Sequence, residues 1–160
     1  MNAKSILGLL MWLLITFAAA GVGAVASANA AGFYEKLSRP GWAPPASLFG
    51  PVWTLLYLLI AIAAWLVWKD AGFRGASLAL SMMIAQLAAN ALWTWVFFAW
   101  HRGALALVEI IVLWILIVIT MTLFWRVRPV AGALFVPYLL WVTFATALTY
   151  SMWQRNPQVL

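Results

Sequence analysis

Residues 104–125 read ALALVEIIVLWILIVITMTLFW, and Glu109 is the one charged side chain among them. About 20 apolar residues, each rising about 1.5 Å along an α-helix, cross the hydrocarbon core of a bilayer. Four more stretches have a similar length and character: 5–26, 51–68, 76–100 and 130–153. The sequence therefore predicts an all-α integral membrane protein, in which a bundle of five transmembrane helices forms a single domain over residues 1–160.

The composition of the whole chain is that of a protein surrounded by lipid. Hydrophobic residues make up 68% of the 160 residues and charged residues only 8%, too few to coat so small a domain with polar groups. The net charge is +6, but the basic residues stand singly at the ends of the apolar stretches, where lipid headgroups bind them. We therefore expect the lipid bilayer, and no nucleic acid, as a partner. The chain has no cysteine, which excludes thiolate metal sites and a cysteine nucleophile.

The longest connection, residues 27–50, is predicted to form a stiff lid over the bundle. Within it, residues 33–45 read FYEKLSRPGWAPP, beginning with a potential helical turn in which Glu35 and Arg39 can pair. Pro40 ends this turn, and the prolines after it restrict the backbone. The alternative is that the loop is only an aromatic belt at the membrane surface. The other connections are short and favour an antiparallel up-down bundle.

The first apolar stretch has a second interpretation. A lysine before the apolar run and the small residues ASANAA at 26–31 are also typical of a secretory signal peptide and its cleavage site. Against cleavage, the run is longer than a usual signal core. In addition, Ala20, Ala24 and Ala28 form a small-residue face that suits close helix packing in lipid. We expect the first helix to be retained.

Polar and aromatic residues recur on one face of the third stretch. They lie at spacings of four, three and four residues, as Gln86, Asn90, Trp93 and Phe97. This spacing places them on one side of a helix, and that side points inward because a polar group in lipid costs free energy unless it is paired or used. Either the two amides help to bind a ligand, or they only bond to neighbouring helices.

Two other stretches bring aromatic residues to the same half of the membrane. The fifth stretch carries an inward stripe and the second carries an aromatic pair: Tyr138, Trp141, Ala145 and Leu148, then Trp53 and Tyr57. Counting alternate crossings places one set of residues in the same half of the membrane as the 27–50 loop: Trp53, Tyr57, Trp93, Phe97 and Leu148. Asn90 and Trp141 are expected to lie somewhat deeper. A lidded apolar pocket with a few polar groups is the usual form of a small-molecule site.

Four segments of this sequence are also recognisable together. They are WAPP at 42–45, GPVWTLLY at 50–57, QLAANALW at 86–93 and FVPYLLWVTFA at 135–145. With these segments in order over nearly its whole length, the chain resembles the translocator protein family, also called tryptophan-rich sensory proteins (TspO/MBR) or peripheral benzodiazepine receptors. The resemblance implies a five-helix bundle, usually a homodimer, whose pocket binds porphyrins such as protoporphyrin IX and haem, sterols and synthetic ligands. These molecules would be ligands, and no cofactor is required.

The resemblance also implies which residues bind the ligand. The family's pocket positions correspond here to Tyr34, Pro44, Trp53, Tyr57, Asn90, Trp93, Trp141 and Ala145. The lid and the two helical stripes add Trp42, Phe97 and Leu148. In some bacterial members, tryptophans matching Trp53 and Trp141 are implicated in a light- and oxygen-dependent breakdown of protoporphyrin, which makes them candidate catalytic residues. The alternative is that both rings only stack on the macrocycle.

The end of the fifth stretch has the form of the family's cholesterol motif, carried by Leu148, Tyr150 and Arg155. That pattern is weak, because these residue types are common at helix ends for interfacial reasons. The family usually has proline where this chain has Trp95, which puts the family's kink at the end of the third helix in doubt. The added ring is expected either to narrow the pocket or to face lipid.

Two polar residues stand near the start of the fourth stretch. Glu109 is expected to pair with Arg102 or with a basic residue at another helix end, rather than to relay protons. His101 lies on the side of the lid, where it could ligate haem iron, although a lone histidine at the interface is more often a headgroup contact.

Together these patterns and the resemblance favour a membrane receptor or sensor that binds porphyrins and related hydrophobic ligands within the bundle, with transport or light-dependent porphyrin degradation as further activities. The alternative is a transporter of porphyrins or other amphipathic molecules, and a third interpretation is an enzyme proper. The chain lacks an ATP-binding loop, a metal-ligand cluster and a nucleophile-base pair, so hydrolytic and metal chemistry are disfavoured. We expect a multi-pass protein of a bacterial cell membrane rather than of the mitochondrial outer membrane.

Overall fold

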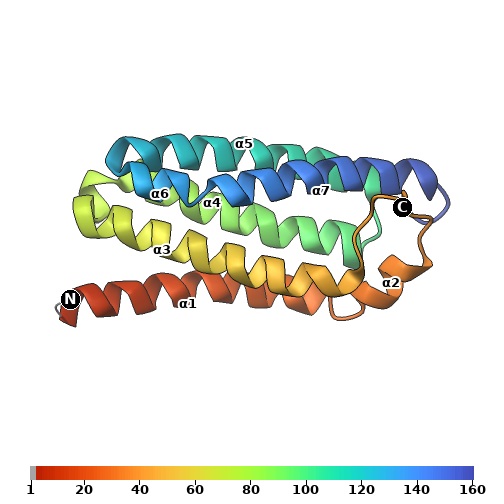
Figure 1. Ribbon diagram of the computed structural model, residues 1–160, viewed down its shortest axis with the longest axis horizontal. Coiled ribbons are helices and arrows are strands. Elements are labelled where there is room, and N and C mark those ends of the chain that lie inside the picture. The colour runs from red at the N-terminus through yellow and green to blue at the C-terminus, as the bar shows by residue number, and fades with distance from the viewer. Residues whose placement is uncertain (1–2) are drawn as a thin grey trace.

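The computed structural model describes residues 3–160, and most of them lie in helices (Figure 1). In chain order the elements are α1 (Ala3–Ala26), α2 (Ala30–Lys36), the 3₁₀ turn η1 (Ala46–Leu48), α3 (Phe49–Gly75), α4 (Ser77–Thr94), the π-helical segment η2 (Trp95–Ala99), α5 (Gly103–Val127), α6 (Pro129–Ala133) and α7 (Val136–Arg155). Within residues 3–160, five segments are long and apolar enough to cross a membrane: Ala3–Ala26, Ala46–Gly75, Ser77–Ala99, Gly103–Val127 and Pro129–Arg155. The predicted class, an all-α integral membrane protein with five spanning helices, is confirmed.

The spanning segments lie side by side and alternate in direction (Figure 1). One end of the bundle carries α2, the loop after it, the link into α5 and the C-terminus. The other end carries the beginning of α1, the link between α3 and α4, and the link between α5 and α6. Successive spans therefore run up and down in chain order, as the short connections led us to expect.

The outer surface of the bundle is apolar, as contact with lipid acyl chains requires. Leu7, Leu14 and Leu140 are 66%, 73% and 65% exposed, which in water would be an unusually apolar surface. Inside, small residues let the helices approach closely. A side chain at Gly8, for example, would overlap the ring of Trp68 on α3.

Helix α3 extends beyond the predicted stretch 51–68 at both ends. It continues past Asp70, because charged side chains at a helix end reach the headgroup region and need not end the helix. The backbone leaves helical geometry only at Gly72, whose φ of +66° is a conformation that glycine adopts without a steric penalty. Asp70 also accepts two hydrogen bonds of 3.1 Å from the Nη1 atom of Arg128, which ties the end of α3 to the residue before α6.

The fifth span consists of two helices rather than one over 130–153. Pro137 stands in the first turn of α7, where its missing N–H needs no acceptor. Inside a continuous helix the same proline would remove a hydrogen bond and clash with the preceding turn. Consequently α6 ends at Ala133 and α7 starts at Val136.

The end of the third span is distorted although it lacks the family's proline. Residues 95–99 form the π-helical segment η2, and the N–H of Trp100 donates to the carbonyl of Trp95, five residues back, at 2.9 Å. The ring nitrogen of Trp95 donates to the carbonyl of Val22 at 3.1 Å. Trp95 therefore packs against α1. The sequence led us to expect that its ring would either narrow the pocket or face lipid, and the structure shows neither arrangement.

The connection 27–50 contains more regular structure than predicted. Helix α2 and the turn η1 lie within it, and α2 already ends at Lys36. Arg39 therefore lies beyond the helix, and the ion pairs of residues 3–160 do not include the expected one between Glu35 and Arg39. Instead, the guanidinium of Arg39 lies over the ring of Tyr34, 5.1 Å from its centroid.

We use the name lid loop for residues 37–45, which are fastened to the bundle at three points. The N–H of Ser38 donates to Oδ1 of Asn156 at 2.8 Å, and Nδ2 of Asn156 donates back to the carbonyl of Ser38 at 3.0 Å. The ring of Trp42 packs edge-on against Phe144, with 5.7 Å between centroids. Near the end of the loop, the carbonyl of Pro44 accepts a hydrogen bond of 2.8 Å from the hydroxyl of Tyr34.

Candidate ligand-binding site

A cavity of about 610 Å³ lies between α1, α3, α4 and α7, in the half of the bundle next to the lid loop. Sites for small molecules have volumes of roughly 300–1,000 Å³ and mostly apolar linings. Here the lining is aromatic on α3, α4 and α7, and small on α1. The cavity therefore has the apolar, aromatic character that the sequence predicted, and its volume is within the range of small-molecule sites.

Aromatic rings in several contacts form the walls of the cavity. On α3, the rings of Trp53 and Tyr57 are 5.6 Å apart. Trp93 stacks on Phe97 with 5.5 Å between centroids and an angle of 15°. Such pairs fix the orientation of each ring, so the walls are held in place before any ligand enters.

The opposite wall, on α7, contributes Trp141. Its ring is 5.9 Å from that of Phe49 at the start of α3, in an edge-to-face contact. Ala145, one turn later on α7, also lines the cavity. Because Ala145 has only a methyl group beside the large indole, it leaves space that a flat molecule could occupy.

A hydrogen-bonded network of four polar side chains connects α3, α4 and α7. The hydroxyl of Tyr57 donates to Oδ1 of Asn90 at 2.7 Å, and Nδ2 of Asn90 donates to the hydroxyl of Tyr138 at 2.9 Å. That hydroxyl in turn donates to Oε1 of Gln86, also at 2.9 Å. The two amides therefore bond to neighbouring helices, the alternative that the sequence left open. In a low-dielectric interior such a paired network stabilises one arrangement of the helices.

Nine of the eleven residues predicted to bind a ligand line the cavity. They are Tyr34, Trp53, Tyr57, Asn90, Trp93, Phe97, Trp141, Ala145 and Leu148. Asn90 lines the cavity as a member of the hydrogen-bonded network, and both polar atoms of its side chain already have protein partners. Binding of a ligand by these residues stays a prediction, but the fold brings them together as the helix-crossing argument expected.

Trp42 and Pro44 do not line the cavity. Trp42 is 51% exposed because its ring lies on Phe144, on the outer side of α7. Pro44 acts through its carbonyl, which accepts the hydrogen bond from Tyr34. Any contact of Trp42 or Pro44 with a ligand remains a prediction. In the structure, Pro44 holds Tyr34, which lines the cavity.

Tyr34, on α2, connects the lid loop to the cavity, because it lines the cavity and bonds to Pro44 of the loop. Its side chain is buried, and burial raises the pKa of its hydroxyl above the usual value of 10, although the nearby charge of Arg39 acts in the opposite direction. The hydroxyl is therefore neutral at physiological pH and able to donate its proton to the Pro44 carbonyl. The edge-to-face contact of its ring with Phe49, at 5.3 Å, fixes the ring further.

Helix α1 supplies a wall of the cavity that the sequence analysis missed. Its lining residues are Phe17, Ala20, Gly21, Gly23 and Ala24, and Ser27 lines the cavity just after the helix ends. The small residues Ala20 and Ala24 were assigned to helix packing, but near the lid they leave the space that forms the cavity. The small residues were visible in the sequence, but they do not tell whether a helix face admits a neighbouring helix or leaves a hollow.

The three residues of the sterol motif do not form one surface. Leu148 is buried and lines the cavity, whereas Tyr150 is 53% exposed. Arg155 donates from Nε to the hydroxyl of Ser151 at 3.3 Å. A sterol on the outside of α7 would meet Tyr150 and Arg155 without Leu148, so sterol binding by this motif stays a prediction.

The polar residues at the start of α5 differ from expectation. Within residues 3–160, Oε2 of Glu109 is buried without a hydrogen-bond partner and Glu109 forms no ion pair, so the expected pair with Arg102 or with a basic residue at another helix end is wrong. Glu109 is one turn into the helix and partly buried, whereas Arg102, just before α5, is exposed. His101 stacks on Phe33 with 4.2 Å between ring centroids. Across residues 3–160, no group of three His, Cys, Asp or Glu side chains is placed to hold a metal ion.

These features define a class of protein: a five-span helical membrane protein with an aromatic ligand cavity in one half of its bundle. Comparison with known sequences makes the assignment specific. The profile of the TspO/MBR family matches residues 11–154, and the chain belongs to that family. The resemblance inferred from the four sequence segments is thereby confirmed.

Named relatives agree with this assignment. Protein CrtK of Rhodobacter capsulatus is 41% identical over 140 residues, which cover 87% of this chain and 86% of that protein. A tryptophan-rich sensory protein of Cereibacter sphaeroides is 43% identical over 124 residues, 78% of this chain and 77% of the relative. The human translocator protein is 35% identical over 126 residues, 78% of this chain and 75% of the relative. The chain is thus similar to proteins named for sensing and for translocation.

Proposed function

We propose that this protein is a membrane receptor that binds porphyrins, such as protoporphyrin IX and haem, and related flat hydrophobic molecules in the cavity between α1, α3, α4 and α7. The observation that carries the proposal is that Trp53, Trp93 and Trp141, from three helices, line one hollow of about 610 Å³. Indole rings stack favourably on flat conjugated molecules. The relatives named as sensory and translocator proteins support a role in ligand recognition.

The polar groups of the cavity support a mainly apolar ligand. Both polar atoms of the Asn90 side chain have partners. The hydroxyls of Ser27 and Thr54 already donate to the carbonyls four residues earlier, Gly23 at 3.0 Å and Gly50 at 2.9 Å. A strongly hydrated ligand would lose its water in this cavity and find few replacements. A large conjugated ring binds water only weakly, so it loses little hydration free energy when it enters the cavity.

A fluorescence titration tests the proposal. Protoporphyrin IX added to the protein in detergent micelles is expected to quench tryptophan emission in a saturable manner. Trp141→Phe and Trp53→Phe should each lower the affinity by roughly two- to tenfold, since aromatic pairs contribute about 0.5–1.5 kcal/mol beyond buried area. Trp125→Phe is the matched control, because that ring is exposed and outside the cavity. Unchanged affinity in both cavity variants would move the site elsewhere.

Transport of porphyrins or other amphipathic molecules is the second candidate, favoured by the name of the human relative. It requires that vesicles containing the protein take up porphyrin faster than empty vesicles. Light-dependent degradation would use molecular oxygen as the oxidant and involve Trp53 and Trp141, which line the same cavity. For degradation, porphyrin absorbance under light must decay faster with the protein than with the variant lacking both tryptophans.

We further propose that the protein resides in a bacterial cell membrane and forms a homodimer there. Relatives from Rhodobacter capsulatus and Cereibacter sphaeroides support the first part. The second is what the resemblance to the family implies, and it is tested by measuring the mass of the protein in nanodiscs. A single copy per disc at all protein concentrations would refute the dimer.

A further inference from the structure

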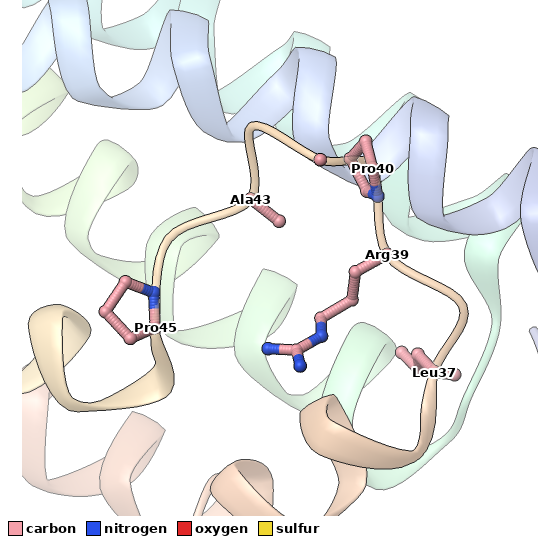
Figure 2. Close-up of a pocket in the computed structure, with 6 residues that line it drawn as sticks. Leu37, Arg39, Pro40, Ala43 and Pro45 are labelled. Carbon is pink, nitrogen blue, oxygen red and sulfur yellow. The ribbon is translucent and has the colours of Figure 1, made fainter.

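A second and smaller hollow lies within the lid loop. It has a volume of about 580 Å³ and is lined by Leu37, Arg39, Pro40, Gly41, Ala43 and Pro45. Figure 2 shows that the Arg39 side chain extends into the space bounded by the loop, with Leu37 on one side and Pro45 on the other. The charged end of an arginine thus occupies the inside of a proline-rich loop rather than pointing away from the protein.

The charge on Arg39 has no acidic partner within residues 3–160. The ion pair in that part of the chain joins Arg128 to Asp70 at the other end of the bundle. The guanidinium lies over the face of the Tyr34 ring at 5.1 Å from the centroid. In that position the ring supports the cation, while the N–H donors in the guanidinium plane can still bind a carboxylate through two parallel hydrogen bonds.

Tyr34 joins this arginine to the large cavity. The Tyr34 ring lines that cavity, its hydroxyl is held by the Pro44 carbonyl, and Arg39 lies on its face. A ligand that fills the cavity as far as Tyr34 is therefore one ring away from the guanidinium. Because Asn156 fastens Ser38, next to Arg39, by two hydrogen bonds, the arginine is positioned before binding, which lowers the entropic cost of using it.

We propose, on the basis of the function proposed above, that Arg39 is the anion-binding residue of this site and that the protein selects flat apolar ligands that carry a carboxylate. The apolar body would occupy the large cavity, and the carboxylate would accept hydrogen bonds from Arg39 at its edge. The cavity walls offer a carboxylate only neutral donors, such as the indole N–H groups of Trp93 and Trp141, which have no partner within residues 3–160. None of the lining residues is cationic, so the cation nearest to Tyr34 is supplied by Arg39. A porphyrin whose carboxylates are esterified keeps the ring and loses this contact.

The test compares protoporphyrin IX with its dimethyl ester on the full-length protein, by the quenching titration described above. The measured quantity is the ratio of the Kd of the ester to the Kd of the acid. Comparing this ratio between variants cancels the different partition of the two porphyrins into detergent. Arg39→Gln should lower the ratio about five- to tenfold, a modest effect for a charge-assisted hydrogen bond because the site is open to solvent. Arg39→Lys, which keeps the charge but not the planar fork, should lower it less.

Lys36→Gln is the matched control, since it removes an exposed cation of the same segment that does not line either hollow. It should leave the ratio unchanged, and thermal unfolding should confirm that all variants are folded. If Arg39→Gln keeps the wild-type ratio, or if Lys36→Gln lowers it equally, the assignment of Arg39 is overturned while porphyrin binding stands. If neither porphyrin binds the wild type, the proposed function and this inference both fail.

Discussion

The network beneath the cavity allows a quantitative test of how the bundle is held together. Tyr57→Phe removes one hydroxyl and keeps the ring, which contacts Trp53 at 5.6 Å and Phe17 at 6.3 Å. The loss is the 2.7 Å hydrogen bond to Oδ1 of Asn90. Hydrogen bonds between membrane helices contribute about 0.6 kcal/mol on average and about 1.7 kcal/mol at most. Because this bond is short and buried, we expect the free energy of unfolding to fall by about 1–1.7 kcal/mol.

Asn90→Leu removes the bonds to both Tyr57 and Tyr138, and should therefore cost about 1–3 kcal/mol. Each single variant removes the Tyr57–Asn90 bond, so the sum of the two single costs counts that bond twice. The cost of the double variant should therefore be smaller than this sum by about the energy of the bond. Unfolding by dodecyl sulfate in mixed micelles, followed by circular dichroism, measures all three values. Thr54→Val is the control, since its hydroxyl bonds only to its own helix. Costs that simply add would refute the inference that this bond couples α3 to α4.

Three further changes test the cavity, the packing and the lid. Gly21→Leu should lower porphyrin affinity at least about tenfold and leave the unfolding midpoint unchanged, because Gly21 lines the cavity and a Cβ there meets nothing within 4 Å; the titration and a thermal melt check it. Gly103→Ala should destabilise by about 1–3 kcal/mol, because the added Cβ would lie 2.6 Å from the Trp153 ring; normal stability in the same unfolding assay would contradict this. Tyr34 has a raised pKa, so its contribution to stability is complete below pH 10 and is lost as the pH rises through its folded pKa. Melts of wild type and Tyr34→Phe should therefore differ most below pH 10 and converge above it.

The sequence predicts the spans well because membrane crossing depends on the length and composition of local stretches. All five predicted stretches correspond to spanning segments. The errors lie where geometry departs from a straight helix. Pro137 was visible in the sequence, but whether a proline kinks a span or divides it into two helices depends on how its neighbours pack. The π-helical segment at 95–99 has no signal in the sequence, because it arises without the proline that would have announced a distortion.

The candidate site was predictable to the extent that it depends on helix faces. Counting crossings brought Trp53 and Trp93 to one half of the membrane, with Trp141 somewhat deeper, and the structure places all three on one cavity. The contribution of α1 was not predictable, since an alanine face can fit a neighbouring helix or leave a space. Two further features could not be predicted either: the contact of Arg39 with the Tyr34 ring, and the absence of an ion pair at Glu109 within residues 3–160. The first depends on where α2 ends, and the second on how the helices around α5 pack.

The double hydrogen bond between Asn156 and Ser38 has a practical consequence for handling this protein. Asn156 follows α7 directly, and Leu160 lies close to Gly103 at the same end of the bundle. A purification tag or fluorescent fusion attached after Leu160 would sit beside the segment that carries Arg39, and could pull on it. Fusions are better placed before α1, which begins at the opposite end of the molecule (Figure 1).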